Sequence, residues 1–237
     1  MKILLLLLFV SLTGAQVRVP GPGGYAAPNA PSVVCHTTAG TTSNSANLTT
    51  SAMNCTGVKV FVAAVSAVGG SYATNVLSDS QGNTWTRLTE IADGYPQVFY
   101  AVSPSVGSSQ TFTVLGGVPG NGMQIAVAGF NNVSSMDVHN GTNLYSSATT
   151  QQPGSITPSQ NGELLVTIYE GLLLDSSTTL AVNSGFTMLD NSNNGYGGGS
   201  NYTALAWQVQ ATAAAINPTW SGIGFYYRTA IAILAFH

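Results

Sequence analysis

The fold is decided by the stretch VKVFVAAVSAV, residues 58–68, in which apolar residues occupy both alternating sets of positions. β-branched and aromatic residues favour strands. A strand that is apolar on both faces is typical of the centre of a sheet rather than of its solvent side. The stretch therefore predicts a buried, central strand.

Further short runs on either side have a period of two, and turns rich in Gly, Asn and Ser separate them. The clearest are GMQIAVAGF (122–130), GELLVTIYEG (162–171) and NYTALAWQVQ (201–210), in which Trp207 falls on the apolar, core-facing parity. The last run, RTAIAILAFH (228–237), is apolar on both faces. No run has the period of a helix. We therefore predict an all-β fold, a single antiparallel β-sandwich over residues 32–237 with no substantial helix.

The first residues have the pattern of an export signal. Lys2 precedes an apolar run at 3–12, and small residues Thr13 and Ala15 suit cleavage after residue 15. Residues 16–31, QVRVPGPGGYAAPNAP, are rich in Pro and Gly and predict an extended leader. We therefore expect a secreted, extracellular protein, with the bacterial periplasm or cell surface as alternatives, and no membrane contact once the signal is removed.

Charge is scarce throughout the chain. Charged residues make up 5%, with 5 Lys and Arg against 8 Asp and Glu. Nucleic-acid binding requires several cations that neutralise phosphates, so this partner is not expected. Low net repulsion also leaves self-association open as an alternative.

The two cysteines, Cys35 and Cys55, fit an oxidising compartment. We predict a disulfide that closes a loop of about 20 residues, which the chain-entropy model values at roughly 3 kcal/mol. Two unpaired buried thiols are the alternative. No further Cys or His pair stands at ligand spacing, so neither a metal nor a cofactor is expected.

The order of the apolar runs resembles a family of little-characterised secreted bacterial β-sandwich modules that are described as jelly-roll-like. The resemblance covers residues 31–237. The pieces that carry it are VKVFVAAVSA, SDSQGNTWTRL, QVFYAV, IAVAGFNNVSSMDV, GELLVTIYEG, SGFTMLD and TAIAILAFH, and the D-S-x-G-N-x-aromatic hairpin is the most specific of them. The resemblance implies the fold and export but no reaction. Members often have Glu before the aromatic of IAVAGF, where this chain has Gly129.

The stretch LSDSQGNTWTRL, residues 77–88, allows two interpretations. Asp79, Gln81 and Asn83 have the spacing of the first ligands of a calcium loop. Such a loop requires Gly at the next position, which here is Thr84, and its flanks are helical rather than β-forming. We therefore interpret the stretch as a hairpin turn that Asp79 closes.

Catalytic groups are few. The sequence contains no G-x-S-x-G motif, and Asp137 with His139 is interpreted as part of a solvated turn rather than as part of a triad. Glu163 and Glu170 lie at opposite ends of one predicted strand, too far apart to act together on a glycoside. Whether Glu170 or Asp137 and His139 belong to an active site stays open, and we assign no catalytic residue.

Aromatic residues in or near turns are the better candidates for a binding site, because flat rings pack against sugar rings. They are Trp85, Tyr95, Tyr196 and Tyr202, the last two in the polar, Gly-rich stretch 190–202. We expect a secreted, non-catalytic module that binds a glycan or another extracellular polymer through these aromatics. The alternatives are a self-assembling structural or adhesive subunit and a hydrolase with an unrecognised site.

Overall fold

A computed structural model describes residues 29–41, 47–67, 76–89, 91, 96–115, 122–144, 148–173, 179–196, 199–223 and 226–237. The expected signal and most of the expected leader lie outside these residues. The described chain is all-β, with sixteen strands and no helix. In this part of the chain, accordingly, no helix has the length and apolarity needed to cross a membrane.

The strands form four antiparallel sheets. The first five-stranded sheet contains, in spatial order, β1 (Ser32–Thr41), β8 (Met123–Asn131), β3 (Val60–Ala67), β6 (Pro96–Val102) and β5 (Thr86–Arg87). A three-stranded sheet contains β2 (Asn47–Thr49), β7 (Phe112–Leu115) and β4 (Val76–Asp79). The second five-stranded sheet contains β9 (Met136–Leu144), β16 (Tyr226–Phe236), β11 (Glu163–Leu173), β14 (Gly199–Gln210) and β13 (Thr187–Tyr196). The second three-stranded sheet contains β10 (Thr150–Gln151), β15 (Trp220–Ser221) and β12 (Ala181–Val182).

The second half of the chain repeats the topology of the first. Adding eight to each label of the order β1-β8-β3-β6-β5 gives β9-β16-β11-β14-β13, and adding eight to β2-β7-β4 gives β10-β15-β12. The sandwich predicted for residues 32–237 thus consists of two consecutive sandwiches. We call residues 32–131 the N-terminal unit and residues 136–237 the C-terminal unit.

The strand registers show which residues of the N-terminal unit correspond to which residues of the C-terminal unit. In the N-terminal unit Val60 lies opposite Phe130 on one side and Val102 on the other. In the C-terminal unit Leu164 lies between Phe236 and Val209 in the same way. The sequences of the matching last strands are alike, IAVAGFN at 125–131 and IAILAFH at 231–237. The repeat is therefore present in residues as well as in topology.

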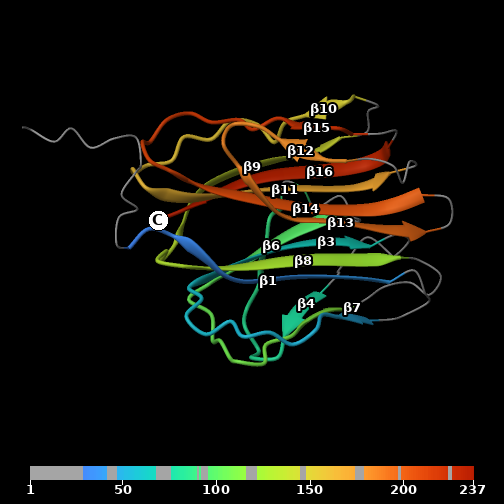
Figure 1. The fold of residues 1–237 in the computed structure, drawn as a ribbon, viewed down its shortest axis with the longest axis horizontal. Coiled ribbons are helices and arrows are strands. Elements are labelled where there is room, and N and C mark those ends of the chain that lie inside the picture. The colour runs from blue at the N-terminus through green and yellow to red at the C-terminus, as the bar shows by residue number, and fades with distance from the viewer. Residues whose placement is uncertain are drawn as a thin grey trace, which may run out of the picture.

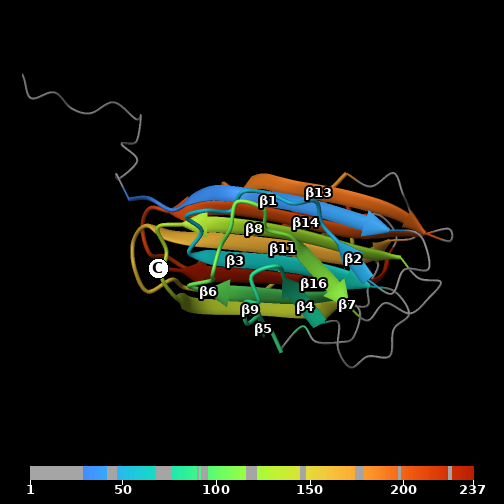
Figure 2. The same ribbon diagram turned by 90° about the horizontal axis from the view of Figure 1, so that it is seen from below.

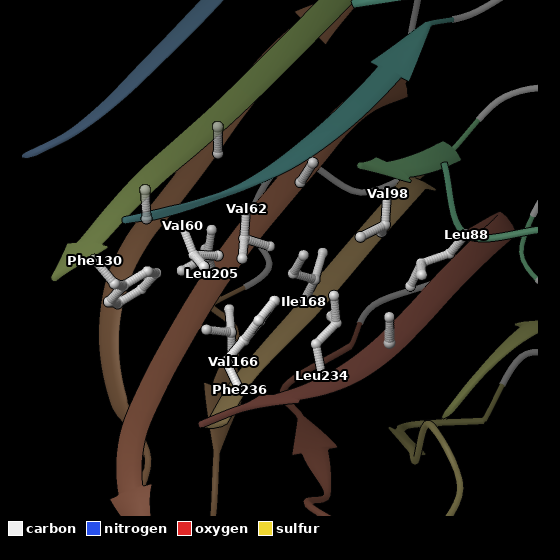
Figure 3. Close-up of a cluster of buried hydrophobic side chains, with 14 of the residues drawn as sticks. Val60, Val62, Leu88, Val98, Phe130, Val166, Ile168, Leu205, Leu234 and Phe236 are labelled. Carbon is white, nitrogen blue, oxygen red and sulfur yellow. The ribbon is translucent and has the colours of Figure 1, made fainter. Parts of the chain in front are cut away.

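The four sheets are stacked as layers. In Figure 1 the small sheet of the C-terminal unit is at the top, the two large sheets follow, and the small sheet of the N-terminal unit is at the bottom. Figure 2 shows the strands of the large sheets running along the same long axis. One apolar cluster fills the space inside each unit, and a third fills the space between the large sheets (Figure 3).

The contacts between the units are reciprocal. The ring of Tyr100 packs against Phe236 with centroids 6.2 Å apart, and Trp207 packs against Phe130 at 6.0 Å. Tyr100 and Trp207 are corresponding residues, since Tyr100 lies opposite Val62 and Trp207 opposite Val166. Each unit thus offers the same surface to the other, as in an isologous dimer made within one chain.

The predicted disulfide is present. Cys35 in β1 is joined to Cys55, with Cα atoms 5.4 Å apart. The bond also explains the Gly in β8. A Cβ atom at Gly129 would lie 2.6 Å from Val58 Cγ2 and 3.0 Å from Cys35 Sγ, so the site next to the disulfide has no room for the Glu that the resemblance leads one to expect.

Replacing both cysteines by Ser is expected to lower the free energy of unfolding by about 3 kcal/mol, because the unfolded chain regains the freedom of the closed loop. The measurement is urea unfolding of both proteins without reductant. Wild type in excess reductant serves as the control and should match the double variant. Equal midpoints for oxidised wild type and variant would contradict the prediction.

Candidate functional site

The hairpin at 77–88 is a turn organised by Asp79. Its Oδ1 accepts a hydrogen bond from the amide N of Gln81 at 2.8 Å, and its Oδ2 accepts one from Trp85 Nε1 at 2.8 Å. Gly82 adopts a φ of 71°, in the left-handed region that Gly tolerates. Both oxygens of the carboxylate therefore face N–H donors, the arrangement of a side chain that closes a turn.

Of the four aromatic residues predicted to form a binding face, the structure describes the side chains of Trp85 and Tyr202, and neither stands free on an exposed turn. Trp85 is half-buried and packs against Phe61 and Phe112 of the N-terminal unit, each at 6.0 Å between ring centroids. Tyr202 is only 3% exposed and belongs to the core of the C-terminal unit, so its placement on an exposed turn was wrong. Tyr95 lies outside the described residues, as does the side chain of Tyr196.

The stretch 190–202 is likewise not a loop over most of its length. Its described residues belong to β13 and β14, which pair as a hairpin. Asp190 on β13 forms an ion pair with His36 of β1, with 3.0 Å between Oδ1 and Nδ1. The stretch thus takes part in strand pairing, and Asp190 contacts the N-terminal unit.

A different group of residues converges at the start of β11. The ligand atoms of Asp137, Glu163 and His237 all lie within 4.8 Å of one another. Asp137 is near the start of β9, Glu163 begins β11, and His237 directly follows β16. Because β16 lies between β9 and β11 and runs antiparallel to both, its end is placed beside their starts.

The two carboxylates of this group are held in place by the turn that precedes β11. The amide N of Ser159 donates to Asp137 Oδ2 at 2.7 Å, and the amide N of Gln160 donates to Glu163 Oε1 at 2.7 Å. Glu163 is only 1% exposed, yet its Oε2 has no hydrogen-bond partner among the described residues. A buried carboxylate oxygen without a partner is costly, and it calls for an explanation at this position.

His237 completes the group from the exposed side. Its Nε2 lies 2.9 Å from Ser135 Oγ, and its carbonyl oxygen accepts a hydrogen bond from Ser134 Oγ at 2.8 Å. The ring is therefore oriented by the segment that joins the two units.

The sequence pattern places Asp137 and His139 in a solvated turn. The structure instead puts both in β9, with Asp137 bonded to Ser159.

A cavity of about 680 Å³ opens next to this group. Its lining combines amide side chains, apolar groups, Glu163 and His237. The lining residues are Asn29, Ala30, Pro31, Asn132, Gln160, Asn161, Gly162, Glu163, Val209, Ala211 and His237. Amides both donate and accept hydrogen bonds. The cavity can therefore bind a ligand that offers hydroxyls on one side and apolar carbon on the other.

Glu170 occupies the other end of β11, as the spacing from Glu163 predicts. It is fully buried, and its Oε2 accepts a hydrogen bond from the amide N of Gln97 in the N-terminal unit at 3.0 Å. Burial raises the pKa of Glu170 well above its usual range, while backbone hydrogen bonds from Gln97 and Val65 oppose the shift. Glu170 is thus a buried carboxyl whose burial favours the protonated form, and its hydrogen bond to Gln97 links the two units.

No protein-family model, curated protein or solved structure matches this chain. The case for a site consequently rests on the geometry itself.

Proposed function

We propose that the protein is a secreted binding module that holds a glycan of the extracellular matrix or cell surface in the cavity beside Glu163 and His237. The observation that carries this proposal is the cavity, whose volume lies in the range typical of ligand pockets. Of the aromatic residues predicted for this role, Trp85 supports the turn at 77–88 and Tyr202 the core of the C-terminal unit, while Tyr95 and the side chain of Tyr196 lie outside the described residues.

The chemistry of the lining supports a hydroxyl-rich ligand. Asn29, Asn132 and Gln160 supply donors and acceptors, while Pro31 and Val209 supply apolar contact. The disulfide is compatible with an extracellular location, which the N-terminal export pattern also supports.

The test is a pair of neighbouring substitutions. Ala211 and Thr212 are both exposed, but only Ala211 lines the cavity. Binding is measured by affinity electrophoresis against a panel of neutral polysaccharides, acidic polysaccharides and peptidoglycan. Ala211→Trp should weaken binding of the retained polymer by about tenfold or more, while Thr212→Trp should bind as wild type does.

Two results would overturn the proposal. One is equal binding by wild type and Ala211→Trp. The other is wild type that is retained by no polymer in the panel. Large, concentration-dependent species in size-exclusion chromatography would then favour the self-assembling subunit, and release of soluble sugars would favour the hydrolase.

A further inference from the structure

We propose that Asp137, Glu163 and His237 bind a divalent transition-metal ion, best fitted by zinc, and that this ion ties the C-terminal unit together where the N-terminal unit has its disulfide. The proposal does not depend on glycan binding in the neighbouring cavity.

The donor set selects the class of ion. Two carboxylates and one imidazole are oxygen and nitrogen ligands of the kind that zinc accepts. Calcium requires six to eight oxygen ligands, and magnesium keeps most of its water, so both fit this set less well. In tetrahedral coordination the ligand atoms lie roughly 3.4 Å apart, about 1.6 times the Zn–N or Zn–O distance. The three ligand atoms now lie within 4.8 Å of one another, so the side chains must close around the ion by up to about 1.4 Å.

The surroundings of the three side chains resemble those of ligands prepared for an ion. One oxygen of each carboxylate is fixed by a backbone amide, from Ser159 or Gln160. Glu163 Oε2 is buried and unpartnered in the described structure. Among the described residues, the one acid–base pair within salt-bridge distance joins His36 and Asp190, so no described Lys or Arg neutralises the carboxylates of Asp137 and Glu163. A bound cation supplies both the missing partner and the missing positive charge.

The internal repeat gives an independent argument. Counting from the matching positions Val60 and Leu164, Cys55 corresponds to Ser159. His36 and His139 lie opposite the matching residues Ala128 and Leu234, and Val33 and Met136 lie opposite Phe130 and Phe236. Counting between these pairs makes Val138 the counterpart of Cys35, and Asp137 the counterpart of the preceding Val34. The hydrogen bond from Ser159 to Asp137 thus lies one strand position from the place that matches the Cys35–Cys55 disulfide.

The same correspondence shows why the two units would use different links. Glu163 takes the position of Lys59, and His237 takes that of Asn131. The N-terminal unit has two cysteines at this place and a lysine in place of the acid, which excludes a cation there. The C-terminal unit has no cysteine but gains a buried acid and an imidazole. A metal ion would join the starts of β9 and β11 to the end of β16, a link comparable to the disulfide.

The experiment uses untagged exported protein, stripped of metal with chelator and titrated with zinc chloride by isothermal calorimetry. We expect one zinc ion per chain and a rise in melting temperature of several degrees at about 100 times Kd. Glu163→Gln and His237→Gln keep the size of the side chain, and each should weaken zinc binding by about tenfold or more. His237 is exposed, so His237→Gln should fold even if Glu163→Gln does not.

Asp190→Asn is the matched control, because it removes the acid of the His36 pair elsewhere in the molecule. It should bind zinc as wild type does. Absence of zinc binding below millimolar concentration would overturn the proposal, as would binding that Asp190→Asn abolishes and His237→Gln leaves unchanged. Ala211→Trp separates the two proposals, since it should lose the glycan without losing zinc.

Discussion

Replacing Trp220 by alanine is expected to lower the free energy of unfolding by about 3–5 kcal/mol. Trp220 on β15 is fully buried in the core of the C-terminal unit. Its ring packs against Tyr169 with centroids 5.8 Å apart, and its Nε1 donates a hydrogen bond to Thr167 Oγ1 at 3.1 Å. The substitution removes a large apolar volume between two sheets that are fixed by their own strand pairing, so the cavity cannot close fully.

Trp220→Phe provides the matched comparison. It keeps most of the ring contact with Tyr169 but loses the hydrogen bond to Thr167. We expect the free energy of unfolding to fall by about 1 kcal/mol for the hydrogen bond, plus a smaller amount for the volume that Phe leaves unfilled. Urea unfolding of wild type and both variants measures the difference. A cost below about 1 kcal/mol for Trp220→Ala would show that the small sheet does not cover a rigid core.

The strands were predictable because period-two patterns are local, but the four layers were not. The run 58–68 is apolar on both faces because Val62 faces the core between the units and Val65 faces the core of the N-terminal unit. The last strand has the same pattern for the same reason. We interpret the run 58–68 as a central strand, although its pattern also indicates that both faces of the sheet are covered, as we expect for the last run.

The same physical cause explains the error at Tyr202. The sequence places Trp207 on the core-facing parity of the run 201–210 and Tyr202 in or near a turn, an interpretation that allows this run a single buried face. In the structure Leu205 packs between the units, while Tyr202 and Ala204 pack inside the C-terminal unit. Trp207, expected in the core, is only half-buried, although it contacts Phe130.

The candidate site was not predictable from spacing in the sequence. Asp137, Glu163 and His237 meet only because β16 lies between β9 and β11, and strand order within a sheet is set by long-range pairing. The one available signal was the similarity of 125–131 to 231–237. It aligns His237 with Asn131 and would have directed attention to the histidine.

The second large effect concerns pH, and it arises from Glu170. Burial raises its pKa in the folded protein above the unfolded value of about 4.3. At a pH between the unfolded and the folded pKa, Glu170 therefore keeps a proton in the folded state that it has lost in the unfolded state. Stability from this group is fully present below the unfolded pKa and is lost as pH rises through the folded pKa, with a slope of up to about 1.4 kcal/mol per pH unit.

Glu170→Gln isolates this effect. The carbonyl oxygen of Gln can accept the hydrogen bond from Gln97 that Glu170 Oε2 accepts now, and an amide cannot ionise. The variant should match wild type in acid and become progressively more stable than wild type as pH rises. Asp190, whose pKa burial also raises against the opposing effect of His36, titrates in both proteins and cancels in the difference.

The measurement is the free energy of unfolding by urea from pH 4 to pH 9 for both proteins. Two curves that stay parallel over this range would contradict a raised pKa of Glu170 in the folded protein. If the two stability curves diverge at high pH, the contact between the two units is weakened there. The reason is that Glu170 on β11 accepts a hydrogen bond from the backbone of β6 across the space between the large sheets. A charge placed there has no cation beside it in the described structure. Its ionisation therefore weakens the contact that makes two sandwiches one folded body.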